Sequence, residues 1–312
     1  MDFGKSFFYC YKKNIDIIYK QILSIMSDIV SIRLMGGLGN QLFQIFTTIT
    51  YGIKNTRKIV LPYTDVLRVG IERPTYWENF LSTLKAMTTF NPGYGITNGT
   101  FVRFSNVFER TFKYEEIPTV KYREVLLNGY YQSYKYFDDY KATIFSMVHL
   151  QDQKNKIKQE FVHLFPDNTH TVSMHFRLGD YVNIQDCHPL LTYEYYERAI
   201  RYLLDNRTVK VHIIYFCQKE DNSTVSTIID KLHDKFPEVV FIKASDDIPD
   251  WKQMLIMSCC YDNIIANSTF SWWGAYFNTH NDKIVCYPKT WFGPRLEHDT
   301  IDLFPKEWIQ IS

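Results

Sequence analysis

The sequence predicts an α/β protein made of two tandem Rossmann-like domains with a cleft between them. Expected strands and helices alternate along the chain, and the alternation restarts after a turn-like break near residue 166. Alternation of this kind favours a parallel, doubly wound sheet in each half. The chain has 312 residues, enough for about two domains of roughly 150 residues, and 46% of its residues are hydrophobic. These values support real hydrophobic cores and exclude a disordered or low-complexity protein.

The N-terminal domain is expected to span residues 29–166 and to open with a strand, a glycine-rich loop, a helix and a second strand. Prolines and glycines interrupt the pattern across residues 63–127, so no element is assigned there. A helical stretch then leads to the turn-like segment Pro166–Thr169, where we place the domain boundary. The expected elements are Ile29–Leu34, Gln41 to about Lys54, Lys58–Leu61 and Lys141–Leu164.

The C-terminal domain, residues 167–312, has the clearer pattern. Strands are expected at Thr171–Phe176, Lys210–Cys217, Val239–Lys243, Asn263–Ala266 and Lys283–Tyr287. Helices are expected at Tyr193–Leu204, Ser223–Phe236, Trp251–Cys260 and Ser271–Asn278. Because ligands bind beyond the carboxyl ends of the strands in such sheets, the loops that follow the strands are expected to face the cleft.

Residues 1–28 form an N-terminal extension. Isoleucines recur at helical spacing from Ile15 to Ile25, which predicts a short helix packed on the domain. A weak membrane-surface helix is the alternative, because lysines accompany the isoleucines. No stretch approaches the roughly 20 apolar residues of a transmembrane helix, and no secretory signal peptide is recognisable. We therefore expect a cytoplasmic protein, with peripheral contact to a cytosolic membrane face as the alternative.

Charge and cysteine usage narrow the class of partner. Lys plus Arg is 35 and Asp plus Glu is 34, which gives a formal net charge of +1. A neutral chain of this kind argues against nucleic-acid binding, which depends on a basic face. The 6 cysteines have neither CxxC nor zinc-like spacing, so reduced thiols are expected.

The first candidate site is the glycine-rich loop MGGLGNQ between the first expected strand and helix. Gly37 and Gly39 allow close backbone approach to a ligand, and the helix N-terminus would attract an anion. Asn40 and Gln41 are polar groups aimed at the same cleft, while N-capping by Asn40 explains the pattern equally well. A nicotinamide-dinucleotide site is excluded, because the third glycine of that fingerprint is a leucine here and no acidic residue ends the second strand.

The second candidate site is HFRLGDY, at the end of the first strand of the C-terminal domain. His175, Arg177 and Asp180 are expected to cluster there. A fixed guanidinium at Arg177 would neutralise a departing pyrophosphate, and Asp180 would orient it through a salt bridge. A purely structural ion pair at the end of a strand is the alternative.

The third candidate site is NSTFSWWGAY, between the fourth strand and the following helix. Asn267, Ser268 and Thr269 place an amide and hydroxyls beside a helix N-terminus, which is typical of a phosphate-binding arrangement. The alternative is that Ser268 or Thr269 only caps the helix and that Trp272 and Trp273 only fill the core.

Taken together, the three motifs resemble those of the inverting α-1,2-fucosyltransferase family. That family carries a GGLGNQ-like loop, an H-x-R-R-x-D-Y motif and an N-S-S/T-F-S-W-W-G-A motif, in this order. The resemblance covers about Ile29 to Phe292 and leaves the N-terminal extension outside. It implies the GT-B architecture, a glycan acceptor and transfer of L-fucose from the nucleotide sugar GDP-β-L-fucose with inversion. It also implies that no metal or other cofactor is essential.

The resemblance also implies residue roles. Arg177 would stabilise the β-phosphate of the leaving nucleotide, and His175 would contact the nucleoside. The phosphates and base would be held by Ser268, Thr269 and Phe270, while Asn40 would face the sugar and acceptor. No general base can be nominated among the carboxylates near the motifs, which are Asp138, Asp139, Asp180, Asp186 and Glu194.

Two departures from the family pattern keep alternatives open. The second arginine of the family motif is Leu178 here, which leaves a catalytically inactive glycan- or nucleotide-binding protein as one alternative. The family's guanine-binding aspartate corresponds to Gln253 here, with Asp250 one helical turn earlier. Because a glutamine amide has one acceptor and one donor, it would suit uracil better than guanine. The second alternative is therefore a UDP-activated 6-deoxyhexose such as UDP-L-rhamnose.

Overall fold

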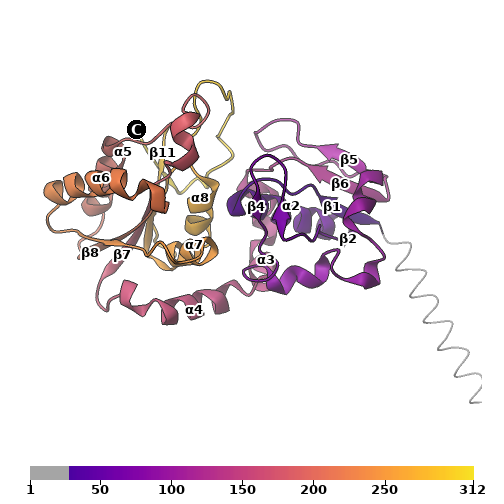
Figure 1. Cartoon of the computed structure of the whole chain (residues 1–312), viewed down its shortest axis with the longest axis horizontal. Coiled ribbons are helices and arrows are strands. Elements are labelled where there is room, and N and C mark those ends of the chain that lie inside the picture. The colour runs from indigo at the N-terminus through magenta and orange to yellow at the C-terminus, as the bar shows by residue number, and fades with distance from the viewer. Residues whose placement is uncertain (1–27) are drawn as a thin grey trace, which may run out of the picture.

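The computed structural model describes residues 28–312, and the isoleucine pattern of the N-terminal extension lies outside this part of the chain. Two parallel sheets lie side by side, one formed early in the chain and one late (Figure 1). The predicted architecture of two α/β units is confirmed. Within the described residues, no helix is long and apolar enough to cross a membrane.

The N-terminal sheet has the strand order β2-β1-β6-β5, and all its neighbours are parallel. Its strands are β1 (Ile29–Ile32), β2 (Lys58–Ile59), β5 (Ser105–Phe108) and β6 (Glu124–Asn128). The helix α2 (Leu38–Lys54) follows β1, and an antiparallel hairpin of β3 (Val66–Leu67) and β4 (Arg73–Pro74) lies outside the sheet. The sequence did not predict β3 to β6, because these strands are short and lie among proline- and glycine-rich turns.

The C-terminal sheet has the order β12-β11-β10-β7-β8-β9, also parallel throughout. Its strands are β7 (His170–His175), β8 (Val211–Phe216), β9 (Val240–Lys243), β10 (Asp262–Ile264), β11 (Val285–Pro288) and β12 (Ile309–Ile311). Its helices are α5 (Tyr193–Asp205), α6 (Asn222–Lys235), α7 (Asp250–Cys259) and α8 (Thr269–Tyr276). Every predicted strand and helix is present with slightly shifted ends, and β12 is an addition.

This strand order creates a topological switch point. From β7 the chain proceeds to β8 and β9 on one side, and later to β10, β11 and β12 on the other. In such sheets a crevice opens between the carboxyl ends of the strands where the order reverses. The second motif follows β7 and the third follows β10, so both motifs lie at this crevice.

The connection between the sheets is two helices rather than the single predicted one. The helix α3 (Lys141–Met147) ends before His149, whose φ of 50° is left-handed, and α4 (Leu150–Glu160) begins immediately after it. A left-handed residue cannot continue an α-helix, so the predicted Lys141–Leu164 helix is wrong at this point. The helix α4 lies below the C-terminal half (Figure 1), and Lys154 Nζ donates to the carbonyl of Phe277 at 3.0 Å.

Aromatic packing joins the two halves through α2 and α8. The rings of Phe43 and Trp272 lie 4.5 Å apart and those of Phe46 and Trp273 lie 5.0 Å apart, and all four side chains are fully buried. The indole Nε1 of Trp273 donates to the carbonyl of Gly39 at 2.8 Å. Aromatic pairs of this kind stabilise the interface beyond their buried area. The core role considered for the two tryptophans is therefore confirmed, and their packing fixes the glycine-rich loop against the third motif.

Candidate functional site

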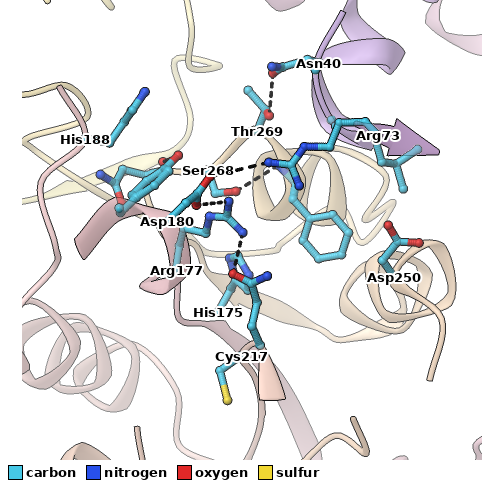
Figure 2. A pocket seen from close by; sticks show the side chains of 18 of the residues that line it. Asn40, Arg73, His175, Arg177, Asp180, His188, Cys217, Asp250, Ser268 and Thr269 are labelled. Carbon is cyan, nitrogen blue, oxygen red and sulfur yellow. Dashed lines mark hydrogen bonds and ion pairs between the residues drawn. The ribbon is translucent and has the colours of Figure 1, made fainter. Parts of the chain in front are cut away.

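The three motifs meet at a cavity of about 520 Å³ between the two sheets. The loop after β1 lies on one side, and the loops after β7 and β10 lie on the other (Figure 2). The hairpin strand β4 and the start of α7 complete the wall. The sequence-predicted residues that line it are Gly37, Gly39, Asn40, His175, Arg177, Asp180, Gln253, Asn267, Ser268, Thr269 and Phe270.

Arg177 is held in a fixed orientation at the end of β7. Its Nη2 lies 2.6 Å from Asp180 Oδ1, which is the expected ion pair, and its Nη1 donates to Gln218 Oε1 at 3.0 Å. Gly179 has a φ of +38°, and a Cβ there would lie 2.1 Å from the same Gln218 oxygen. The glycine therefore leaves room for the glutamine that steers the guanidinium. An arginine held in place by two hydrogen-bond partners is suited to binding a phosphate group.

His175 is a neutral imidazole buried beneath this arginine. Burial, together with the charge of Arg177, lowers the pKa of His175 to about 3. Its Nδ1 is buried and has no hydrogen-bond partner among residues 28–312. Its ring lies 5.5 Å from that of Phe270. A buried, unpartnered ring nitrogen on a cavity wall is available to a ligand.

The third motif caps α8 and also lines the cavity. The hydroxyl of Ser268 accepts from the backbone N–H of Phe270 at 3.3 Å, so the expected helix cap is present. Thr269 instead donates from its hydroxyl to Asn40 Oδ1 at 2.8 Å. Asn267 donates to the carbonyl of Pro189 at 2.8 Å, while its own Oδ1 is buried without a partner in the described part of the chain. Capping and cavity lining are thus compatible roles for this loop.

Asn40 links the two halves of the molecule and is not a helix cap. The helix α2 begins at Leu38 with Gly37 as its N-cap, so the capping alternative for Asn40 is wrong. Asn40 Oδ1 accepts from Gln132 Nε2 at 3.0 Å as well as from Thr269 across the cleft. Its amide nitrogen makes no hydrogen bond within residues 28–312 and remains a donor at the cavity wall.

Gln41 differs from its prediction as a ligand-facing residue. It is fully buried and is not part of the cavity wall. Its Nε2 donates to the carbonyl of Gly36 at 3.0 Å and to that of Pro74 at 2.8 Å. Gln41 therefore ties the glycine-rich loop to β4.

The strand β4 and the residues after it bring side chains to the site that the sequence did not single out. Arg73 Nη2 lies 3.6 Å from Asp180 Oδ2, on the opposite side of the cleft. The hydroxyl of Tyr76 donates to Asp250, at the start of α7. These contacts join residues far apart in sequence, within a segment that gave no pattern, so no sequence signal could have found them.

Another missed residue is His188, which lies on the cavity wall. Its ring stacks on Tyr181 at 4.6 Å, and its side chain makes no hydrogen bond within the described chain. Burial lowers the pKa of His188. The charges of Arg177 and His298 lower this pKa further, while the charge of Asp180 raises it. The imidazole is therefore neutral near pH 7 and free to accept a proton.

Among the carboxylates near the motifs, Asp180 lines the cavity and the others do not. Asp138 accepts from the hydroxyl of Tyr276 at 2.6 Å, and Asp139 pairs with Lys54. Glu194 accepts from a neighbouring threonine, and Asp186 pairs with Arg295. Within residues 28–312, no group of three or more His, Cys, Asp or Glu side chains could hold a metal ion.

Comparisons with known proteins show what this chain is similar to. The family model described as glycosyl transferase family 11 matches residues 7–312, and so extends into the N-terminal segment that the motifs left out. The chain is 28% identical to the O-antigen biosynthesis glycosyltransferase WbnK of Escherichia coli, over 83% of this chain and 93% of that protein. It is 27% identical to an alpha-1,2-colitosyltransferase of Escherichia coli, over 91% of this chain and 99% of that protein. The fold is similar to that of POFUT1 in complex with GDP-fucose, with a TM-score of 0.50 and 11% sequence identity. The match covers 84% of this chain and 98% of that chain.

Proposed function

The chain belongs to glycosyl transferase family 11, and we propose that it transfers L-fucose or a related 6-deoxyhexose from the GDP-activated sugar to a glycan hydroxyl, with inversion. It is an enzyme of the glycosyltransferase class, which excludes the inactive binding-protein alternative. The single observation that carries the choice of GDP is the carboxylate of Asp250 beside Gln253 at the cavity wall.

Gln253 and Asp250 both bring acceptor oxygens to the cavity wall. Gln253 Nε2 uses one of its two N–H groups to donate to the carbonyl of Ile248 at 2.8 Å. Its Oε1 has no hydrogen-bond partner in the described part of the chain. Asp250 adds a carboxylate one turn earlier on α7. Guanine presents N–H donors at N1 and N2, whereas uracil presents one N–H donor between two carbonyl acceptors. A carboxylate beside an amide oxygen favours guanine, which can donate from both N1 and N2, over uracil, which has one N–H donor.

The diphosphate would lie between Arg177 and the start of α8. As the bond between the sugar and GDP breaks, negative charge develops on the β-phosphate, and a guanidinium already in place stabilises it. Ser268, Thr269 and the N-terminus of α8 would add hydroxyl and N–H donors. His175 and Phe270 would contact the nucleoside. We expect turnover without a divalent cation, because these groups supply positive charge where a metal would otherwise do so.

The sugar and acceptor would occupy the end of the cavity lined by Asn40 and His188. In an inverting transfer the acceptor oxygen attacks the anomeric carbon on the face opposite GDP and gives up its proton. His188 is the group we propose to accept that proton, because its imidazole is neutral and its ring nitrogens are unpartnered within the described residues. Asp180, by contrast, is committed to Arg177.

The relatives agree with this sugar class. One of them is an alpha-1,2-colitosyltransferase, and colitose, like fucose, lacks the 6-hydroxyl group. Because the two sugars differ away from the diphosphate, the same diphosphate site would serve either. We therefore propose a GDP-linked 6-deoxyhexose donor, with fucose as the first candidate.

Calorimetric titration of the full-length protein with GDP and UDP tests this proposal. We expect GDP to bind at least about tenfold more tightly, since a mismatched uracil leaves a polar group unpaired. D250N and Q253A should reduce the preference for GDP, while D247N should not, because Asp247 is exposed and lies outside the cavity wall. Equal binding of both nucleotides, or preference for UDP, would contradict the assignment.

A further inference from the structure

We propose that Arg73 binds the donor's diphosphate from the N-terminal side of the cleft, as a second guanidinium opposite Arg177. This inference rests on the proposed function, because it requires a nucleoside diphosphate in the cavity. Arg73 lies on β4 and lines the cavity (Figure 2).

Two guanidiniums share one carboxylate across the cleft. Arg177 lies 2.6 Å from Asp180 Oδ1, and Arg73 lies 3.6 Å from Asp180 Oδ2. Asp180 alone pairs with both guanidiniums, so it balances only one of their two charges. A diphosphate provides the anionic oxygens that the other charge lacks.

The contact between Arg73 and Asp180 is the longer of the two, and Arg73 can exchange it for a contact with phosphate. At 3.6 Å, the contact of Arg73 with Asp180 is too long for a hydrogen bond, and the side chain is 34% exposed. Exposed ion pairs of this kind contribute little to stability. When a diphosphate enters, Arg73 can therefore move from the carboxylate to phosphate oxygens, while Asp180 continues to orient Arg177.

Position 178 explains why a second arginine is needed from elsewhere. Leu178 packs against the core of the C-terminal sheet and is not part of the cavity wall. The loop after β7 thus contributes one guanidinium, that of Arg177, to the cavity. The hairpin of the opposite half supplies the second guanidinium, so the phosphate site is complete only when both halves contribute.

The position of Arg73 is set by Gln41 and Tyr76. Gln41, on α2, holds the carbonyl of Pro74 at 2.8 Å, and Tyr76 donates its hydroxyl to Asp250 on α7. The backbone of Arg73 pairs with Leu67 in the hairpin. Residues 73–76 therefore span the cleft, with Arg73 at the expected phosphate end and Tyr76 at the expected base end. Gln41 is a positioning residue that acts through this segment.

The test measures how much the diphosphate adds to binding. Affinities of the full-length protein are measured for GDP and guanosine, and for UDP and uridine, with wild type, R73A and R73K. The control is R68A, because Arg68 lies in the same hairpin segment, pairs with Glu72, is exposed and does not line the cavity. We expect R73A to weaken diphosphate binding about tenfold or more, while nucleoside binding stays unchanged. R73K should retain part of the affinity, and R68A all of it.

A second arm tests the positioning role. Q41A should weaken GDP binding in the wild-type background but add little in the R73A background, because the two residues act through one contact. Equal losses for diphosphate and nucleoside in R73A would indicate a merely structural role and would overturn the proposal, as would no loss at all. A wild type that prefers UDP contradicts only the guanine assignment, and the R73A comparison is then judged on UDP and uridine. Wild-type protein that binds neither diphosphate would overturn both proposals.

Discussion

At the scale of single residues, the site combines side chains that are fixed by hydrogen bonds or burial with side chains that keep polar atoms free for a ligand. Arg177 is bonded to Asp180 and Gln218, which fixes its orientation, and His175 is buried and neutral beside it. His188 is the contrasting case, since its ring is held by stacking and not by hydrogen bonds within the described chain. One group is thus preorganised for a developing negative charge and another is left free to take a proton.

Replacing Arg177 should affect the chemical step more than folding. We expect R177A to lower kcat by about 10²–10³, the loss seen when one preorganised donor to a developing negative charge is removed. R177K should be intermediate, because lysine keeps the charge but loses the planar fork. The matched control is R201A, since Arg201 pairs with Glu197 at 2.6 Å on the outside of α5. Steady-state kinetics check this, and an R177A enzyme with unchanged kcat would contradict the assigned role.

The pH dependence of transfer should report on His188. Burial lowers the pKa of His188 below its ordinary value of about 6.5, so the imidazole stays neutral as pH falls from 8 toward that value. Wild-type kcat/KM should therefore be flat over this range and fall only at lower pH, when the ring becomes protonated. H188Q should lose about 10²-fold or more of the rate and lose this acid limb.

The control for that profile is H163Q, because His163 is exposed and lies outside the cavity wall. A variant H188Q that keeps the wild-type acid limb would show that another group takes the acceptor proton.

At the scale of elements, the contact between α2 and α8 places two of the three motifs opposite each other. A Cβ on Gly39 would lie 2.5 Å from the backbone carbon of Thr269, so the helices approach closely only because this residue is glycine. Gly37 is different, because a Cβ there would meet nothing within 4 Å. The loop therefore uses one glycine for packing and leaves another open to the cavity.

These two glycines give matched variants. G39A should lower the free energy of unfolding by about 1–3 kcal/mol, since the added methyl group meets backbone that cannot move aside easily. G37A should change it by less than about 1 kcal/mol, the ordinary effect at a helix N-cap. Thermal and denaturant unfolding of both variants check the difference. Equal stability of G39A and wild type would contradict the close packing of α2 on α8.

The elements also show what sequence patterns can and cannot predict. The C-terminal sheet was predictable because its strands are apolar runs separated by amphipathic helices, as in Val211–Phe216 followed by Asn222–Lys235. Strands such as β5 and β6 were missed because these short segments among turns have too few residues to show the alternation of apolar and polar side chains that marks a strand. The break at His149 was missed because a single left-handed residue leaves no compositional mark.

At the scale of the whole molecule, the site exists because two sheets face each other. The motif residues were identifiable from the sequence because each motif sits at the end of a strand, as Arg177 and Ser268 do. The residues that make contacts across the cleft were not identifiable, because Arg73 and Tyr76 contact partners more than 100 positions away in the sequence. Such contacts depend on how the halves are arranged, which no local pattern encodes.

The measurement that tests the central claim most directly is a donor panel. The purified full-length protein would be offered GDP-L-fucose, GDP-colitose, UDP-L-rhamnose and UDP-glucose with simple glycans as acceptors, in the presence of a chelator, and nucleotide release would be followed. We predict release of GDP from a GDP-linked 6-deoxyhexose and no release of UDP. Release of UDP from a UDP-linked sugar, with the GDP-linked sugars left intact, would contradict the account.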